Sequence, residues 1–277
     1  MRKLGLIAGG GSLPIALAEH CQGAGRPFFV IRLRGFADAA LADFPGAEVG
    51  VAELGRVFEA LKREGCEAVC MAGNVDRPDF SALKPDLRGL KSLPGAVAAA
   101  RKGDDALLRF LLGEFEREGF VIEGADAVFA DLRLAAGALG DYRPGAEHQA
   151  DIALARQVVE TLGVLDVGQA AVIAGGVVLA VEAQEGTDAM LARCIDLPAA
   201  LKGAPGARLG VLIKWPKSIQ DRRIDLPVVG VATVEAAAAA GLAGMVVQAE
   251  AALAIDKAAV RAAADRLGLF IVGLPAS

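Results

Sequence analysis

The sequence has 277 residues, of which 54% are hydrophobic, and its formal net charge is -5 at pH 7. A chain of this length and composition buries a large core, so extensive disorder is excluded and two domains are expected. The acidic balance leaves no basic footprint, which argues against nucleic acid as a partner. Only two histidines are present and the four cysteines form no CxxC pair, so any bound metal is expected to use oxygen ligands.

The longest apolar stretches, such as residues 170–181 and 234–247, are shorter than the ~20 residues of a membrane-spanning helix or are interrupted by Gly and Glu. The apolar run at 4–8 is also too short for the core of a signal peptide. We therefore expect a cytoplasmic protein without a transmembrane segment. In that compartment the cysteines, Cys21, Cys66, Cys70 and Cys194, are expected to be reduced and buried.

The first part of the chain alternates short apolar runs with amphipathic stretches, and this βαβαβ order predicts a parallel sheet with right-handed crossovers. We expect an N-terminal Rossmann-like domain over residues 1–132. Its expected elements are, in chain order, a strand at 4–8, a helix at 14–22, a strand at 28–33, a helix at 55–64, a strand at 68–72, a helix at 104–118 and a strand at 120–122.

Residues 133–146 are rich in Gly, Ala, Pro and Asp and are expected to form a linker to a C-terminal mixed α/β domain over residues 147–277. The alanine tract at 236–240 favours a tightly packed helix, although alanine-rich helices also suit the interface of a homodimer. The expected elements are a helix at 151–162, paired strands at 170–174 and 177–183, a helix after Thr187, strands at 211–214, 226–229, 244–247 and 270–272, and helices at 234–240 and 257–267.

Two loops of the first domain are candidates for ligand contact. Residues 9–14, Gly-Gly-Gly-Ser-Leu-Pro, lie between a predicted strand and a predicted helix, where backbone amides bind phosphate. The alternative is a tight turn with Pro14 at the first helical position. Residues 73–78 follow a strand, at the sheet edge where such folds bind ligands, whereas Gly103-Asp104-Asp105 equally suits a helix N-cap with an acidic first turn. The candidate substrate-binding residues here are Gly10, Gly11, Ser12, Leu13, Gly73 and Asn74.

The second domain is richer in polar groups at strand ends. Gln169 enters a strand, and residues 182–188 leave one with three carboxylates and a hydroxyl before a helix begins. The alternative interpretation of Thr187 is a simple N-cap. The candidate substrate-binding residues of this region are Gln169, Glu185, Gly186 and Thr187.

Residues 214–227 interleave cations with acids. Asp221 and Asp225 can ligate a hard cation such as Mg²⁺ through oxygen, while the lysines and arginines can neutralise phosphate oxygens. This pattern suits phosphoryl transfer, although a solvated, salt-bridged loop is the alternative. The basic residues concerned are Lys214, Lys217, Arg222 and Arg223.

Six blocks in this order resemble the UDP-2,3-diacylglucosamine pyrophosphatase family of Gram-negative bacteria that lack the calcineurin-like enzyme for the same step. The resemblance spans nearly the whole chain, with Trp215 and Val228 as departures beside the lysine and the proline. The six blocks are residues 9–14, 72–75, 103–105, 165–169, 185–188 and 221–227.

The resemblance implies a Mg²⁺-dependent hydrolysis that gives UMP and 2,3-diacylglucosamine 1-phosphate (lipid X), with water attacking the phosphorus on the glucosamine side. It also implies two domains with the ligand between them, and it maps the family's acidic motif onto Asp221 and Asp225. The lipid substrate suggests weak peripheral contact with the inner membrane, because no convincing basic amphipathic helix is evident in the sequence.

We expect Asp225 to act as a metal ligand or as the base that orients water, with Asp221 and Asp188 completing the metal-binding cluster. Lys214 is expected to steady the pyrophosphate, and Gln220, Arg222 and Arg223 to bind substrate. Two other classes stay open. One is a dinucleotide-dependent oxidoreductase in which Arg32 or Arg34 meets a 2′-phosphate, and the other is a noncatalytic nucleotide-sugar sensor.

Overall fold

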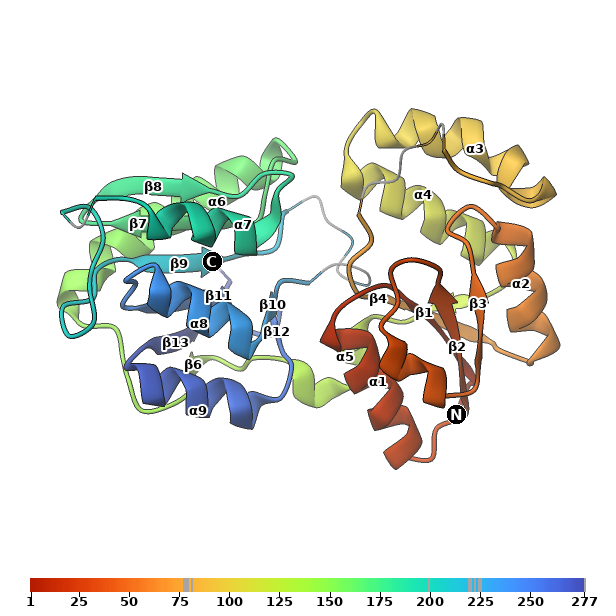
Figure 1. Cartoon of the computed structure of the whole chain (residues 1–277), viewed down its shortest axis with the longest axis horizontal. Coiled ribbons are helices and arrows are strands. Elements are labelled where there is room, and N and C mark those ends of the chain that lie inside the picture. Colours follow the sequence, from red (N-terminus) through yellow and green to blue (C-terminus); the bar gives the residue numbers. More distant parts are fainter. Residues whose placement is uncertain are drawn as a thin grey trace. The chain divides into compact units, whose positions relative to one another are not determined.

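The computed structural model describes residues 1–76, 80, 82–198, 200–218, 221, 223 and 226–276. The chain forms two compact units, Met1–Ala130 and Asp131–Ser277. Each unit is built on a sheet with helices on both faces, as Figure 1 shows. The expected fold class, a parallel α/β sheet followed by a mixed α/β sheet, is therefore confirmed.

The first unit contains a sheet in which every neighbouring pair of strands is parallel, in the order β3-β2-β1-β4-β5. Its elements are β1 (Leu4–Ala8), α1 (Ser12–Gly23), β2 (Phe28–Leu33), η1 (Ala39–Asp43), β3 (Gly46–Val49), α2 (Leu54–Arg63), β4 (Ala68–Ala72), α3 (Leu87–Ala100), α4 (Asp104–Arg117), β5 (Val121–Ile122) and α5 (Ala125–Val128).

The central strand β1 is buried along its whole length, which explains its unbroken apolar sequence. Leu6 of β1 lies in register between Val30 of β2 and Cys70 of β4. Helices α1 and α5 lie on one face of this sheet, and α2 and α4 lie on the other, with α3 packed outside them (Figure 1). The sheet is thus covered on both sides, as a parallel sheet requires.

The strand β3, the helix α3 and the short helices η1 and α5 of this unit were missed by the sequence analysis. The edge strand β3 is only four residues long, and the helix α3 contains Pro94 in its interior. A proline normally breaks a helix because it removes one backbone hydrogen bond. In α3 the helix nevertheless continues through Pro94 to Ala100. Asp86 is its N-cap, since the carboxylate of Asp86 accepts the backbone N–H of Gly89 at 2.7 Å.

The second unit contains a six-stranded sheet in the order β6-β13-β11-β9-β7-β8 and a two-stranded sheet of β10 and β12. Its elements are η2 (Ala130–Leu132), β6 (Gly137–Ala138), η3 (Ala146–His148), α6 (Gln149–Val164), β7 (Ala170–Ala174), β8 (Val177–Val181), α7 (Gly186–Ile195), β9 (Val211–Lys214), β10 (Val228–Val229), α8 (Val231–Ala239), β11 (Gly244–Gln248), β12 (Leu253–Ala254), α9 (Lys257–Leu267) and β13 (Phe270–Leu274).

Successive residues of the central strands enter opposite cores. Val172 and Leu212 pack with α7, α8 and α9, whereas Ile173 and Ile213 pack with α6 on the other face. This alternation follows from the two-residue repeat of a strand. The predicted hairpin of β7 and β8 is confirmed, and it turns through Gly175 and Gly176, both with positive φ.

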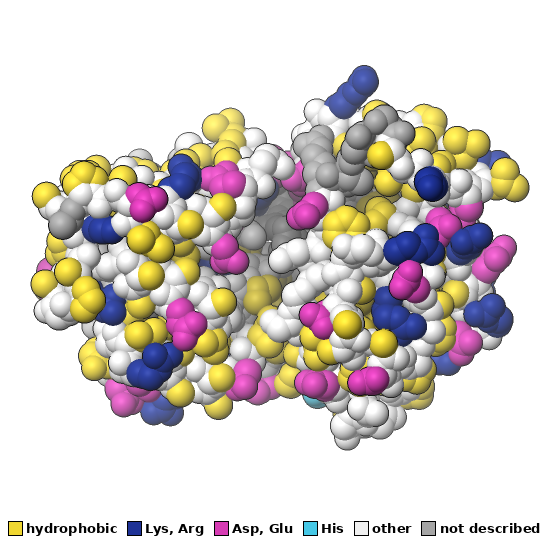
Figure 2. Space-filling view, viewed as in Figure 1, with side chains coloured by type: hydrophobic (Ala, Val, Ile, Leu, Met, Phe, Trp, Pro, Cys, Tyr) yellow, Lys and Arg dark blue, Asp and Glu magenta, His cyan; other side chains and the backbone are white. Residues whose placement is uncertain are grey.

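Residues 133–146, which we expected to be a linker, lie within the second unit and supply its edge strand β6. Within the alanine tract 236–240, Ala237 and Ala240 are fully buried in the hydrophobic core that α8 covers. Among the residues described, no helix is both long and apolar enough to cross a bilayer. Figure 2 shows basic and acidic side chains interspersed on the face it presents.

Candidate functional site

The first unit reverses its strand order between β1 and β4, because β2 and β3 lie to one side of β1 and β4 and β5 lie to the other. At such a switch point the connections that follow the two strands lead to opposite sides of the sheet, and ligands of open α/β sheets bind there. The loops concerned are those that follow Ala8 and Ala72. These loops contain Gly10, Gly11, Gly73 and Asn74, and the other two candidates of this unit, Ser12 and Leu13, are the first residues of α1.

These two loops are joined through their backbones. Gly10 donates its N–H to the carbonyl of Asn74 at 2.8 Å, and Asn74 donates to the carbonyl of Gly10 at 2.9 Å. A Cβ atom on Gly73 would lie 2.5 Å from the Gly10 oxygen, so the loops approach too closely for a side chain there. Gly11, Ser12, Gly73 and Asn74 are exposed, which leaves this loop pair accessible to a ligand.

Helix α1 begins at Ser12, and its N-cap is Gly11, which has no side chain to cap the helix. Pro14 is consequently the third helical residue, so the expectation of a proline at the first helical position is wrong. A helix start built from glycine presents backbone N–H groups and the positive end of the helix dipole, which is the chemistry that anions favour.

The two arginines assigned to a 2′-phosphate contact are both engaged elsewhere. Arg32 donates to the carbonyls of Leu41 and Phe44 at 3.1 and 3.2 Å, so it holds the connection between β2 and β3. Arg34 forms ion pairs with Glu48 and Glu53. This arrangement gives no support to the dinucleotide-dependent oxidoreductase.

The sequence Gly103-Asp104-Asp105 forms the start of a helix, which was one of the two interpretations of this motif. Gly103 is the N-cap of α4, and both aspartates lie in the first turn, where they complement the helix dipole. Asp105 is almost fully buried and forms an ion pair with Arg109 at 2.6 Å, one helical turn later.

In the second unit, polar side chains gather at one edge of the six-stranded sheet. β8, β9 and β11 all end at this edge, and the antiparallel β7 begins there. Gln169 precedes β7, Lys214 ends β9 and Gln248 ends β11. The backbone N–H of Trp215 donates to the carbonyl of Gln169 at 2.8 Å, which ties the strand ends together.

Lys214 is the predicted catalytic lysine, and its side chain is only 7% exposed. Its Nζ donates to the carbonyl of Val228 at 2.8 Å, which links the end of β9 to β10. The ammonium is therefore a fixed positive charge at the carboxyl edge of the sheet. Gln248, which is also buried there, was missed, although a polar residue ending an apolar strand was a usable signal.

Glu182 organises the same edge and was not among our candidates. Its buried carboxylate accepts the backbone N–H of Gln169 at 2.9 Å and the hydroxyl of Thr187 at 2.7 Å. Thr187 is the second residue of α7, whose N-cap is Glu185, so the interpretation of Thr187 as an N-cap is wrong. The signal for Glu182 was a carboxylate directly after the strand 177–181.

The remaining candidates at the start of α7 are more exposed. Glu185 forms an ion pair with Arg193, and Gly186 has a φ of +78°, which favours glycine at that position. Asp188 is an exposed residue of the first helical turn. These residues lie within the turn that follows β8.

The segment between β9 and β10 holds two of the three residues of the predicted acidic cluster, Asp221 and Asp225. Arg223 binds the carboxylate of Asp221 through two nitrogens, with Nη2–Oδ2 and Nε–Oδ1 distances of 2.7 and 3.0 Å. Asp225, Gln220 and Arg222 lie outside the described residues. Within the part of the chain that is described, no group of three His, Cys, Asp or Glu side chains has the geometry to hold a metal ion.

Lys217 of the same segment is committed to a carboxylate. Its Nζ lies 2.7 Å from Oδ1 of Asp166, and both side chains are largely buried. The pair fastens the start of the segment to the loop between α6 and β7. Lys217 and Arg223 thus have the salt-bridged role that was the alternative interpretation of this charged region.

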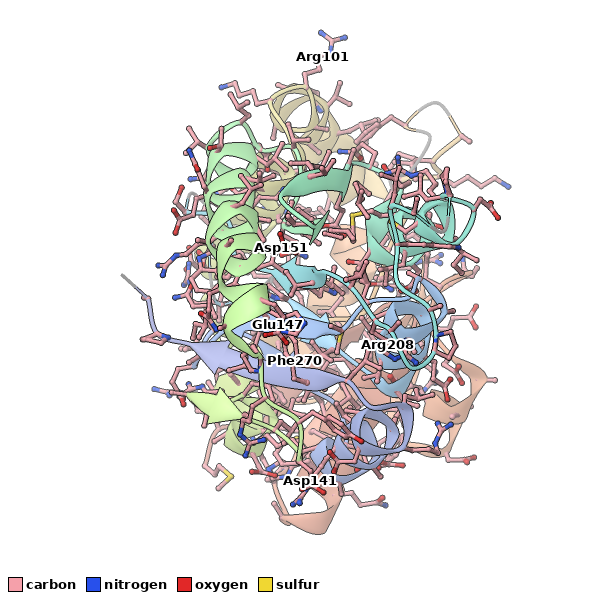
Figure 3. All side chains as sticks on the ribbon, turned by 90° about the vertical axis from the view of Figure 1, so that its left-hand side faces the viewer. Arg101, Asp141, Glu147, Asp151, Arg208 and Phe270 are labelled. Carbon is pink, nitrogen blue, oxygen red and sulfur yellow. The ribbon has the colours of Figure 1, made fainter. Side chains whose placement is uncertain are left out.

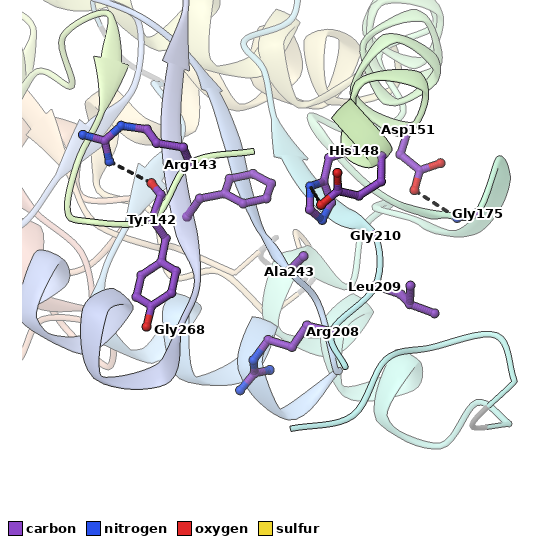
Figure 4. Close-up of a pocket in the computed structure, with 12 residues that line it drawn as sticks. Tyr142, Arg143, His148, Asp151, Gly175, Arg208, Leu209, Gly210, Ala243 and Gly268 are labelled. Atoms are coloured by element: carbon purple, nitrogen blue, oxygen red, sulfur yellow. Dashed lines mark hydrogen bonds and ion pairs between the residues drawn. The ribbon is translucent and has the colours of Figure 1, made fainter. Parts of the chain in front are cut away.

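A separate hollow of about 260 Å³ lies at the opposite edge of this sheet. Gly210, Ala243 and Phe270, which line it, stand at the amino ends of β9, β11 and β13. Figure 3 places Arg208 and Phe270 on this side, and Figure 4 shows Asp151 held by the backbone of Gly175. None of the predicted site residues lines this hollow, so it is not the predicted site.

All four cysteines are free and buried. Burial raises the pKa of each thiol, and that of Cys66 reaches about 11. Neutral, buried thiols are poor nucleophiles and poor metal ligands. The expectation of reduced, structural cysteines is therefore confirmed.

Comparison with known proteins gives a consistent result over both units. Residues 3–132 match the model of the LpxI N-terminal domain, and residues 135–272 match that of the LpxI C-terminal domain. The chain is 61% identical over 274 residues to the UDP-2,3-diacylglucosamine pyrophosphatase LpxI of Caulobacter vibrioides. That alignment covers 99% of this chain and 98% of the relative.

Proposed function

The chain belongs to the LpxI family, and from that premise we propose that it hydrolyses the pyrophosphate bond of UDP-2,3-diacylglucosamine. Water attacks one phosphorus of the P–O–P linkage and the bond from that phosphorus to the bridging oxygen breaks, so the products are UMP and 2,3-diacylglucosamine 1-phosphate. The Caulobacter relative bears the name of this activity. The reaction is a step of lipid A assembly.

The observation that supports this proposal best is Lys214. It is a buried ammonium at the carboxyl edge of the second sheet, held by the carbonyl of Val228. A fixed positive charge in a water-poor site stabilises the negative charge that develops on phosphate oxygens as a P–O bond breaks. Lys214 would therefore bind the pyrophosphate and favour its cleavage.

The neighbouring groups would orient the substrate. Glu182 fixes Thr187 and the backbone of Gln169, so the start of β7 and the start of α7 are held together. Their amide, hydroxyl and backbone groups suit hydrogen bonding to a nucleotide sugar. In the first unit, the loop pair of Gly10, Gly11, Ser12, Leu13, Gly73 and Asn74 offers exposed backbone and the start of α1 to a phosphate-bearing substrate.

Mg²⁺ is the proposed cofactor. Asp221 and Asp225 would hold it, with Asp188 as a third candidate, and the ion would supply positive charge to the phosphate oxygens. The donor chemistry fits, because Mg²⁺ in such sites is commonly bound by one or two carboxylates together with substrate phosphates. Asp225 would act as a ligand or would orient the attacking water.

The direct test is product formation by the purified protein with UDP-2,3-diacylglucosamine in detergent, with and without Mg²⁺. We expect UMP and lipid X in equal amounts by mass spectrometry, formed only with Mg²⁺ and lost in Asp225→Ala while substrate still binds. Asp43→Ala, which changes an exposed aspartate of the first unit, is the control. Absence of UMP from folded wild-type protein would contradict the proposed function.

We also propose that the protein works in the cytoplasm and touches the inner membrane only peripherally. The proposed substrate carries two acyl chains, so it resides in a bilayer. A short-lived surface contact is enough to reach such a lipid, since neither insertion nor a covalent anchor is required.

A further inference from the structure

Two leucines of helix α3 are exposed to solvent, whereas a glycine and a serine of the same helix are buried against the protein. Leu87 and Leu90 are 83% and 56% exposed, whereas Gly89 and Ser92 are buried. Surface helices normally have the opposite arrangement. The exposed positions 87, 90, 91, 94 and 98 follow the three- and four-residue spacing of one helical face.

Helix α3 cannot rotate about its axis to bury its exposed face. A Cβ atom on Gly89 would lie 1.9 Å from the carbonyl oxygen of Ala52, so only glycine fits there. Ser92 donates a hydrogen bond of 2.7 Å to the buried carboxylate of Glu114 on α4. Packing therefore fixes the leucines on the solvent side.

Exposed cations lie before α3, on it and directly after its end. Lys84, Lys91, Arg101 and Lys102 are all exposed, and residues 87–102 include no acidic residue. None of these four cations has a carboxylate partner within the described part of the chain. In Figure 3, Arg101 projects away from the protein, and Figure 2 shows hydrophobic side chains gathered over α3.

We propose that this surface, formed by Leu87, Leu90, Lys91, Pro94, Ala98, Arg101 and Lys102 and termed the α3 outer face, docks on a bilayer that contains anionic lipid. The proposal rests on the proposed function, which places the substrate in a membrane. The leucines enter the boundary between headgroups and acyl chains, and the cations contact lipid phosphates.

Charge favours a lipid surface over a second copy of the chain. In a two-fold symmetric contact the same patch meets itself, so a patch whose charged residues are Lys91, Arg101 and Lys102 would bring only positive charges together. Like charges without partners oppose such an interface. An anionic bilayer instead supplies the complementary charge and an apolar layer for the leucines.

The test is cosedimentation of the full chain with phosphatidylcholine vesicles, with and without phosphatidylglycerol. We expect wild-type protein to bind the anionic vesicles and to be released by salt. Leu87→Ser with Leu90→Ser should weaken binding by about tenfold or more, because two apolar side chains leave the bilayer boundary. Lys91→Glu with Arg101→Glu should abolish the preference for anionic vesicles.

The matched control is Val164→Ser with Leu165→Ser, which alters two side chains that are 66% and 67% exposed on the second unit. The α3 variants should hydrolyse detergent-dispersed substrate at the wild-type rate, so loss of docking and loss of the proposed function are distinguishable. Unchanged vesicle binding in both α3 variants, or no wild-type binding, would overturn the proposal. A dimer that dissociates in the leucine variant would also overturn it in favour of a second copy.

Discussion

The hydroxyl of Thr187 donates a hydrogen bond of 2.7 Å to the buried carboxylate of Glu182. The same carboxylate accepts the backbone N–H of Gln169. One side chain thus joins the start of β7 to the start of α7, at the edge of the sheet where Lys214 lies. Thr187 and Gln169, the two residues that Glu182 holds, were predicted from the sequence, whereas Glu182 itself was not.

Removing the acceptor should destabilise the second unit. Glu182→Ala leaves a buried hydroxyl and a backbone N–H without their partner, and we expect a loss of ~2–4 kcal/mol in the free energy of unfolding. Thr187→Val, which removes only the donor, should cost about 1–2 kcal/mol. Urea denaturation measures both changes, and Thr187→Ser, which keeps the hydroxyl, is the control. Equal stability of the Ala variant and wild type would show that the carboxylate has no such role.

Lys214 should matter for turnover more than for folding. Lys214→Met removes the hydrogen bond to Val228, a loss of about 1 kcal/mol in the free energy of unfolding. It also removes the charge proposed to stabilise the developing oxyanion, so kcat should fall by about 10²- to 10³-fold. Steady-state kinetics separates kcat from KM, and Lys214→Arg should recover part of the loss.

The control for this change is Lys202→Met, because Lys202 also donates to a backbone carbonyl, that of Ile195, in the connection before β9. It should retain wild-type kinetics. A Lys214→Met enzyme with normal kcat and a raised KM would limit the lysine to substrate binding.

Gly73 tests the close approach of the two loops in the first unit. Gly73→Ala must hold a φ of +90° and also place a methyl group 2.5 Å from the carbonyl oxygen of Gly10. Gly25→Ala must hold a φ of +66° but meets no atom within 4 Å. We expect a loss of ~1–2 kcal/mol for the second variant and a clearly larger loss for the first. Thermal unfolding of the two proteins side by side measures the difference, and equal losses would mean that the loops separate easily.

The thiols should titrate late and react slowly. Burial raises the pKa of Cys66 to about 11, so its thiol stays neutral in the folded protein at pH values where an unfolded chain is ionised. The stability that this difference provides is complete below the unfolded pKa and is lost as pH rises from about 9 to about 11.

Urea denaturation between pH 8 and 11 should therefore show a smaller loss of stability in Cys66→Ala than in wild type. With Ellman's reagent at pH 8, the four thiols should react only after denaturation. Rapid labelling of folded protein would contradict the burial on which both expectations rest.

Sequence periodicity was sufficient for most of the central elements. β1, β2, β4, β7, β9 and α9 occupy the predicted residues, because runs such as Leu4–Ala8 are buried on both faces and read as continuous apolar segments. Periodicity failed for α3, in which Leu87 and Leu90 face solvent and Pro94 lies in the interior of the helix. It also failed for β3, a short edge strand with little burial to specify it.

The sequence motifs identified most of the candidate site residues. They could do so because these residues lie at the ends of predicted strands. Gly10 and Asn74 are far apart in the chain, yet they follow the neighbouring strands β1 and β4. Gln169 precedes β7 and Lys214 ends the neighbouring β9, so these two residues also lie at the same edge of their sheet. An α/β chain therefore reveals its candidate loops by their position after apolar runs. The match of six short blocks in order then pointed to the family.

The sequence by itself determined the fold class, the family and the loops that carry polar groups, since these depend on local pattern and on the order of elements along the chain. Only the tertiary structure decided which partner each charged or polar side chain binds and which apolar side chains stay exposed. Lys217 forms an ion pair with Asp166, and Thr187 donates a hydrogen bond to Glu182. Leu87 and Leu90 of α3 are exposed to solvent. These outcomes depend on side chains from distant segments meeting in space, where burial makes each polar group take a partner, and no local pattern records that choice.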